Sequence, residues 1–252
     1  MEKNIIYNED CFETMKNKIN SKSIDCVLTS PPYNMTKRKG GVTDSGRYDV
    51  YKDWMSEEEY INFSVKLFEN FDKIVKQNGV VMYNLSYSKE NGTLPYLVMA
   101  NIYSKTNWMV VDTIVWEKTC SMQTPSDRRH CSRKCELVFI LARKTEKETF
   151  NRYPGVSSIG TNGQTYYHTY DNIIHAKNND AKTHKLNQAT YSTDFCTHLL
   201  KLYAKMEDVI YDPFMGTGTT ANACVKMNMN FIGSEISENQ CKYAYERIGI
   251  KK

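Results

Sequence analysis

The sequence predicts an α/β fold with a mostly parallel sheet, and three observations support this prediction. Short apolar runs typical of buried strands alternate along the chain with longer segments whose apolar residues recur at helical spacing. A glycine-rich turn at 213–219 joins a strand to a helix, as in βαβ units. The length of 252 residues suits one domain with a small insertion.

The individual elements follow from local patterns. An apolar run at 24–28 ends at Pro31 and Pro32, which terminate a strand. Ser56, followed by three glutamates, resembles a helix cap, and Asn78-Gly79 ends the helical periodicity that follows. Helices are therefore predicted over 57–77, 94–104, 191–205, 219–227 and 239–248. Strands are predicted over 24–28, 80–84, 108–116, 136–142, 209–214 and 231–233.

Two segments interrupt this alternation. Residues 35–53 are polar and contain glycine, and we predict a loop there. Residues 145–185 are rich in Tyr, Asn, Thr and His without any period, and we expect an irregular segment or a small appended subdomain. The strands at 108–116 and 136–142 are candidates for an antiparallel pair near the end of the sheet order.

Composition excludes several classes of protein. The chain is 40% hydrophobic and 25% charged, as in globular proteins, and has no run of about 18 apolar residues that could cross a membrane. The N-terminal residues lack the apolar core of a secretory signal. Most of the eight cysteines lie in apolar runs, which indicates buried thiols and a cytoplasmic location. The spacing of Cys120, His130, Cys131 and Cys135 matches no common zinc motif, so we expect no metal.

Basic residues are concentrated in the middle of the chain. The net charge is +4, but residues 118–185 alone hold 12 lysines and arginines against 6 acidic residues. This distribution indicates a surface that faces a polyanion, with Arg128, Arg129 and Arg133 in its densest part. A solvated charged loop is the alternative. A second basic cluster occupies 37–39.

The C-terminal part contains a candidate ligand site. Strand, Asp212-Pro213-Phe214-Met215-Gly216-Thr217-Gly218-Thr219-Thr220, helix and strand follow one another, and Glu235 ends the second strand. The glycines allow a sharp turn close to a ligand, and an acid in the position of Glu235 can accept hydrogen bonds from both ribose hydroxyls. The unit lacks the third glycine of a dinucleotide fingerprint and the lysine of a P-loop. These features favour an adenosine ligand without a polyphosphate.

A second candidate site follows the strand at 24–28. In Ser30-Pro31-Pro32-Tyr33, the two prolines fix the backbone, so that the Ser30 hydroxyl and the Pro31 carbonyl present two hydrogen-bond acceptors. Tyr33 adds an aromatic surface on which a base can stack. Two acceptors beside an aromatic ring suit a planar heterocycle with an exocyclic amine. An ordinary proline turn is the alternative for these four residues alone.

Together, the two motifs resemble those of the β-type amino-methylating DNA methyltransferases, which use S-adenosylmethionine and carry the catalytic motif before the cofactor motif. Residues 29–34 (Thr-Ser-Pro-Pro-Tyr-Asn) match the first motif and 212–220 match the second over their whole lengths. Weaker matches lie at 8–11, 80–84, 114–118 and 184–205. The resemblance covers about 4–145 and 184–248.

The resemblance implies a Rossmann-like S-adenosylmethionine methyltransferase fold, with a mostly parallel seven-stranded sheet, helices on both faces and a small insertion. It implies a single catalytic domain over 1–252, within which 119–183 forms a basic target-recognition insertion. The amine of a flipped base would attack the sulfonium methyl in line, without a covalent enzyme intermediate.

Residue roles carry over only through the matching motifs. The implied catalytic residues are Ser30, Pro31, Pro32 and Tyr33. Asp10 would meet the adenine amine and Glu235 the ribose, in a cofactor site that comprises Asp10, Cys11, Asp212, Phe214, Gly216, Gly218, Thr219, Thr220 and Glu235. The expected phosphate contacts are Lys37, Arg38, Lys39, Arg128, Arg129 and Arg133.

The target base and the partners are less tightly defined. A serine in the position of Ser30 favours cytosine N4, because serine is commoner there in that subgroup of the family. The alternatives are adenine N6, an amide nitrogen on a protein, and a catalytically inactive DNA-binding module. Double-stranded DNA is the expected partner, and a homodimer and a restriction endonuclease acting on the same site are further candidates. No membrane association is expected.

Overall fold

The computed structural model describes residues 1–34, 50, 55–87, 91–122, 129–180, 187 and 189–250. Eight strands in this part of the chain form one sheet, in the order β1-β10-β9-β2-β3-β5-β4-β8. The bounds are β1 Ile5–Tyr7, β2 Ile24–Thr29, β3 Val75–Leu85, β4 Trp108–Met122, β5 Arg133–Arg143, β8 Ile173–Ala176, β9 Val209–Asp212 and β10 Asn230–Ser234. β5 runs antiparallel to both β3 and β4, and all other neighbouring strands are parallel. The mostly parallel α/β sheet is confirmed, as is the antiparallel pair of β4 and β5.

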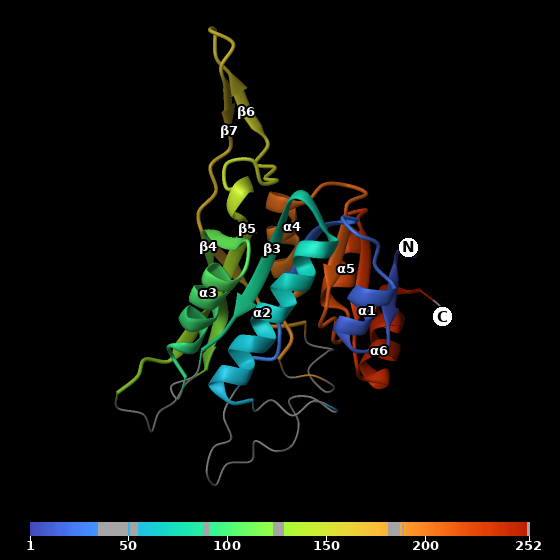
Figure 1. The fold of residues 1–252 in the computed structure, drawn as a ribbon. Coiled ribbons are helices and arrows are strands. Elements are labelled where there is room, and N and C mark those ends of the chain that lie inside the picture. The colour runs from blue at the N-terminus through green and yellow to red at the C-terminus, as the bar shows by residue number, and fades with distance from the viewer. Residues whose placement is uncertain are drawn as a thin grey trace.

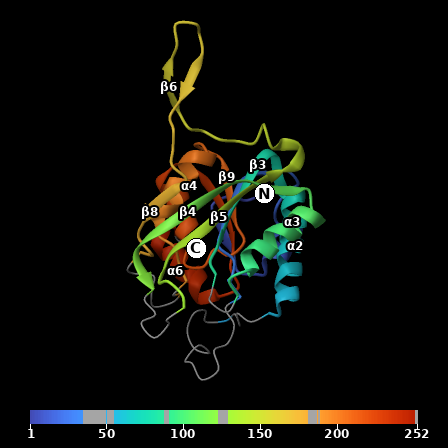
Figure 2. The same ribbon diagram turned by 90° about the vertical axis from the view of Figure 1, so that its left-hand side faces the viewer.

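Six α-helices in the described ranges cover both faces of this sheet (Figures 1 and 2). Their bounds are α1 Cys11–Asn17, α2 Glu57–Ile74, α3 Leu94–Lys105, α4 Thr193–Tyr203, α5 Thr219–Lys226 and α6 Glu238–Ile248. One hydrophobic cluster contains residues of α1, α2 and α3, and the other contains residues of α4, α5 and α6.

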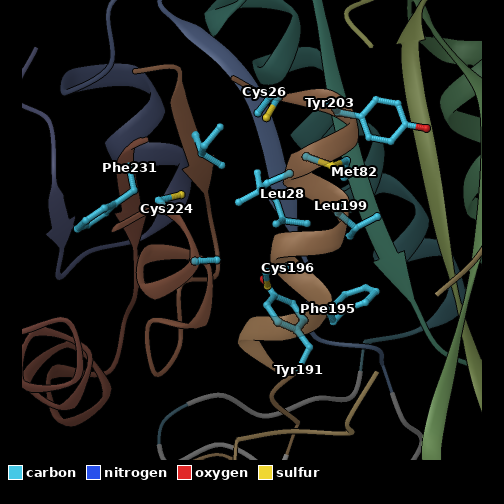
Figure 3. Close-up of a cluster of buried hydrophobic side chains, with 14 of the residues drawn as sticks. Cys26, Leu28, Met82, Tyr191, Phe195, Cys196, Leu199, Tyr203, Cys224 and Phe231 are labelled. Carbon is cyan, nitrogen blue, oxygen red and sulfur yellow. The ribbon is translucent and has the colours of Figure 1, made fainter. Parts of the chain in front are cut away.

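The alternation of side chains in β2 shows why both faces need helices. Cys26 and Leu28 belong to the cluster under α4, whereas Val27 between them belongs to the cluster under α2. Figure 3 shows Cys26 and Leu28 close to the side chains of α4. A strand that is apolar on both faces is stable only in the middle of a two-sided sheet. This central position places the end of β2 at the middle of the sheet edge.

The main departures from prediction concern β3 and β8. Helix α2 was expected to reach residue 77, but it ends at Ile74, and β3 begins at once. The carbonyl of Ile74 accepts the amide N–H of Ser23 at 2.8 Å, and the carbonyl of Val75 accepts Nη2 of Arg143, also at 2.8 Å. Tertiary donors therefore satisfy this helix end, which local propensity could not show. The sheet has eight strands within the described residues where seven were expected, and β1 and β8 were not among the strands predicted from local patterns.

The segment between β5 and β8 leaves the body of the molecule as a two-stranded ribbon (Figure 1). It consists of β6 Val156–Ile159 and β7 Thr165–Tyr167, after a short 3-10 helix, η1, at Lys144–Glu146. The amide of Asn151 donates to the carbonyl of Asn78, near the start of β3. The ribbon therefore emerges at the edge where the parallel strands begin, opposite the edge where β2 and β9 end.

None of the helices in the described ranges has the length and apolarity needed to cross a membrane.

Candidate active site

The two predicted motifs meet because β2 and β9 are parallel neighbours. Cys26 pairs with Ile210 and Val27 with Tyr211, so both strands end at the same edge of the sheet. At this edge, Oγ1 of Thr29 donates a hydrogen bond of 2.8 Å to Oδ1 of Asp212. The residue before the Ser-Pro-Pro-Tyr motif is thus bound directly to the first residue of the glycine-rich motif.

Asp212 organises this junction from a fully buried position. Its Oδ2 accepts hydrogen bonds from Oγ1 of Thr220 at 2.6 Å and from the hydroxyl of Tyr191 at 3.1 Å. Its Oδ1 also accepts the amide N–H of Phe214 at 3.0 Å. Burial raises the pKa of the Asp212 carboxyl, and the hydrogen bonds it accepts oppose this shift. Because both oxygens are engaged by the protein, Asp212 holds the wall of the site together.

The glycine-rich turn has the backbone geometry that only glycine adopts readily. Gly216 and Gly218 have φ angles of +53° and +78°, and α5 begins directly afterwards at Thr219. A Cβ atom on Gly218 would lie 2.7 Å from Cβ of Ala244, so this glycine also permits the contact between the turn and α6. The Thr217 hydroxyl is buried and has no hydrogen-bond partner within the described residues.

Glu235 is held in a fixed orientation at the end of β10. Its Oε2 accepts the amide N–H of Gly216 at 2.8 Å, and its Oε1 accepts that of Ser237 at 2.8 Å. One of these donors lies in the glycine-rich turn and the other caps α6. The carboxylate is therefore fixed beside the turn and is half-exposed.

These elements surround an open cleft. Of the residues predicted from sequence, eight line it: Asp10, Cys11, Ser30, Pro32, Phe214, Gly216, Thr219 and Glu235. Both motifs therefore face one cavity. The remaining predicted residues of the two motifs, which are not among the lining residues, are Pro31, Tyr33, Asp212, Gly218 and Thr220.

Asp10 reaches the cleft from the start of α1. As the N-cap of this helix, it accepts the amide N–H of Phe12 through Oδ1 at 2.8 Å. Its side chain is exposed, whereas Cys11 beside it is buried, and burial raises the pKa of the Cys11 thiol. Among the described lining residues, Asp10 and Glu235 are the only charged ones, so this part of the cleft favours a neutral or cationic ligand.

An aromatic wall of the cleft was not predicted. Phe63 of α2 lines the cavity beside Phe214, with ring centroids 5.9 Å apart, and Phe12 packs edge-on against Phe63. In the sequence, Phe63 belongs to the apolar stripe of an amphipathic helix and has the same signal as a core residue. Nothing in the local sequence pattern distinguishes a side chain that lines a cavity from one that packs in the core.

A polar corner of the cleft was also missed. Nδ2 of Asn187 donates to Oε1 of Gln240 at 2.9 Å, and both residues are buried and line the cavity. Asn187 lies in the segment 184–205, which the sequence analysis gave only as a weaker match to the family. The resemblance implied no role for Asn187, and Gln240 was predicted only as part of the last helix.

The Ser-Pro-Pro-Tyr turn is anchored at several points. The carbonyl of Pro32 accepts the hydroxyl of Tyr60 at 2.8 Å, whereas that of Pro31 accepts no hydrogen bond within the part of the chain that is described. Asn34 has a φ of +51°, and its Oδ1 accepts the amide N–H of Met55 at 2.6 Å. Tyr33 is only 9% exposed, and its hydroxyl lies in a buried network. Its stacking on a base stays a prediction.

The predicted DNA contacts fall in two groups. Lys37, Arg38, Lys39 and Arg128 lie outside the described residues. Arg129 is exposed, and Arg133, at the start of β5, donates from its guanidinium to the carbonyl of Tyr87. β5 runs antiparallel to β3, so the start of β5 lies at the same edge of the sheet as Ser30.

Comparison with known proteins agrees with this arrangement. The family model for N6_N4_Mtase DNA methylases matches residues 24–246. The type II methyltransferase M.HinfI of Haemophilus influenzae is 24% identical over 252 residues, which cover 97% of this chain and 68% of that protein. The structure of PvuII DNA methyltransferase (cytosine-N4-specific) superimposes with a TM-score of 0.73 at 14% identity, covering 96% of this chain and 85% of that chain.

A structure of an M1.HpyAVI–SAM complex matches with a TM-score of 0.60 at 18% identity, covering 96% of this chain and 98% of that chain. The family match includes both the Ser-Pro-Pro-Tyr and the glycine-rich motif. The chain therefore belongs to the N6/N4 DNA methylase family and is an S-adenosylmethionine-dependent DNA methyltransferase.

Proposed function

We propose that this enzyme methylates N4 of cytosine in double-stranded DNA after flipping the target base into the cleft. The observation that carries the proposal is that Ser30 lines the same cavity as Phe214 and Glu235. A base amine held at Ser30 can therefore meet a methyl donor held by the glycine-rich motif without crossing a wall of side chains.

The charge and the apolar surface of the described residues in the cofactor part of the cleft suit S-adenosylmethionine. Asp10 and Glu235 provide negative charge for a cationic ligand, and Phe63 and Phe214 provide an apolar surface for adenine. The unpartnered Thr217 hydroxyl is a hydrogen-bonding group that a bound ligand would satisfy. We propose that Glu235 holds the ribose and Asp10 the adenine amine.

Ser30 and Pro31 would hold the reacting amine. Their oxygen atoms accept hydrogen bonds from the two N–H groups of the amine. These hydrogen bonds draw the nitrogen lone pair out of conjugation with the ring and aim the lone pair into the cleft. A cofactor held by Asp10 and Glu235 would supply an electrophilic methyl group, and methylation of the amine would form an N–C bond, break the C–S bond and release one proton to solvent. Positioning and exclusion of water would provide most of the acceleration.

Two observations favour cytosine over adenine. Ser30 is a short, neutral acceptor, and one of the structurally similar proteins is named as cytosine-N4-specific. Adenine N6 is the second candidate, because the same acceptor pair suits its amine. Incubation of mixed-sequence duplex DNA with the enzyme and cofactor, followed by digestion to nucleosides and mass analysis, separates them. N4-methyl-2′-deoxycytidine supports the proposal, and N6-methyl-2′-deoxyadenosine overturns its choice of base.

The structure divides the proposed recognition segment 119–183 into two parts. The end of β4, the start of β5 and residues 177–180 after β8 lie at the edge of the cleft, because Lys118 pairs with Ala176 and Glu117 with Cys135. The β6–β7 ribbon lies at the opposite edge. We propose that Arg129 and Arg133 at the cleft edge contact phosphates, and that a restriction endonuclease shares the target site, in keeping with the type II names of the relatives.

A further inference from the structure

A buried ion pair lies directly beside the Ser-Pro-Pro-Tyr turn. Glu136 of β5 is 5% exposed, and its Oε1 pairs with Nζ of Lys118 of β4. Because Leu137 of β5 pairs with Leu85, the last residue of β3, Glu136 lies just past the end of β3. Taking two charges out of water is costly, so such a pair needs further hydrogen bonds to be stable.

The second oxygen of Glu136 connects the pair to the catalytic turn. Oε2 accepts the hydroxyl of Tyr33 at 2.8 Å and Nδ2 of Asn84, also at 2.8 Å. The Tyr33 oxygen in turn accepts Oγ–H of Ser30 at 2.7 Å and Nδ2–H of Asn84 at 2.6 Å. A continuous chain of hydrogen bonds therefore runs from Lys118 through Glu136 and Tyr33 to Ser30.

Counting hydrogens fixes the direction of this chain. A carboxylate that is paired with a lysine carries no hydrogen, so Tyr33 must donate its single hydroxyl hydrogen to Glu136. The bond between Tyr33 and Ser30 must then use the hydrogen of Ser30. With its hydrogen turned toward Tyr33, the Ser30 oxygen offers only lone pairs to the cleft that it lines.

We propose that Glu136 is a positioning residue that makes Ser30 a pure hydrogen-bond acceptor, acting through Tyr33. This inference rests on the proposed function, in which Ser30 receives the base amine. An acceptor-only Ser30 attracts a base that presents an NH₂ group and repels a base that presents a carbonyl oxygen at the same position. Glu136 thus sets the enzyme's preference for amino bases over keto bases, and Lys118 holds the Glu136 carboxylate in place through the ion pair.

Replacement of the carboxylate by an amide tests this role at nearly constant shape. In Glu136→Gln, the side chain gains an N–H that can donate to the Tyr33 oxygen, which frees the hydroxyl hydrogens of Tyr33 and Ser30 to turn the other way. The single-turnover rate of methyl transfer should fall about tenfold to hundredfold, while the affinity for S-adenosylmethionine stays within about twofold. Tyr33→Phe breaks the same chain and should have a similar effect.

The double variant separates a relay from general support of the fold. If Glu136 acts through Tyr33, the rate of Glu136→Gln/Tyr33→Phe should match the slower single variant, whereas independent structural effects would multiply. Glu117→Gln is the matched control, because Glu117 also lies in this pair of strands and pairs with Lys134, but near the surface. Its rate should equal that of the wild type.

Base preference gives the decisive measurement. Competition binding gives the affinity of each enzyme for duplexes with cytosine or uracil at the target position. The ratio of the two affinities is then compared between the wild type and Glu136→Gln, because differences in base-pair stability cancel in this comparison. The preference for cytosine should fall at least about fivefold in Glu136→Gln. An unchanged preference or an unchanged rate overturns the proposal for Glu136. If Ser30→Ala is itself as fast as the wild type, the proposed function fails instead, which this series distinguishes.

Discussion

Oγ1 of Thr29 and Oδ1 of Asp212 lie 2.8 Å apart, although 183 residues separate them in the chain. This hydrogen bond ties the strand that ends in the Ser-Pro-Pro-Tyr turn to the strand that ends in the glycine-rich turn. Both residues are fully buried, so water cannot replace either partner. The bond therefore helps to fix the distance between the base side and the cofactor side of the cleft.

Thr29→Val should destabilise the protein by about 1–2 kcal/mol, because it removes one hydrogen bond to a buried carboxylate while nearly keeping the shape of the side chain. Urea denaturation measures the free energy of unfolding. Thr29→Ser keeps the hydroxyl and should retain more of the stability. A valine variant as stable as the wild type would show that the bond contributes nothing.

Glu235→Gln should weaken the binding of S-adenosylmethionine about tenfold to hundredfold, because an amide replaces the charged acceptor proposed for the ribose hydroxyls and for the amides of Gly216 and Ser237. Titration calorimetry measures the affinity. Glu238→Gln is the control, since Glu238 is exposed and pairs with Lys242. Equal affinities for the two variants would remove Glu235 from the cofactor site.

Gly218→Ala should cost about 3 kcal/mol or more in the free energy of unfolding. The substitution combines an unfavourable φ of +78° with a Cβ atom 2.7 Å from Cβ of Ala244. Gly249→Ala separates the two causes, because Gly249 has a φ of +72° but nothing within 4 Å of its Cβ position. This control should cost only about 1 kcal/mol. Similar losses at both positions would mean that the contact with α6 adapts freely.

The stability of the protein should carry a pH dependence that originates at Asp208. Burial, together with the neighbouring charge of Asp25, raises the pKa of the Asp208 carboxyl. The folded state then binds this proton more tightly than the unfolded state. Asp208 therefore stabilises the folded protein at pH values below the ordinary aspartate pKa of about 4, and this stabilisation is lost as pH rises through the raised pKa.

Asp208→Asn removes this titration. Its free energy of unfolding relative to the wild type should therefore rise as the pH increases from about 4 through the raised pKa. Urea denaturation of both proteins across this range measures the difference. A difference that stays constant with pH would assign the titration to other groups.

The central elements and the two motifs could be predicted because their signals are local. Proline ends β2, Ser56 caps α2 through a reciprocal pair with Glu59, and the two glycines mark the turn before α5. Parallel neighbours then bring the ends of β2 and β9 together without any further information from the sequence. The shared cleft follows from topology.

The parts that were missed depend on contacts between distant residues. β8 is a short edge strand with alternating burial, and it is recognisable only by its pairing with Val115–Lys118. Arg143 and Ser23 determine where α2 ends. Glu136 is an unremarkable acid in the sequence of β5, and its link to Tyr33 crosses 103 residues. No local pattern reports such a partner.

The most direct test of the two-sided cleft is a paired measurement on Ser30→Ala. Titration calorimetry gives its affinity for S-adenosylmethionine, and single-turnover assays give its rate of methyl transfer to duplex DNA. We predict an affinity within about twofold of the wild type and a rate at least about a hundredfold lower, because Ser30 holds the base and not the cofactor. A parallel loss of affinity and rate, or an unchanged rate, would contradict this division of the cleft.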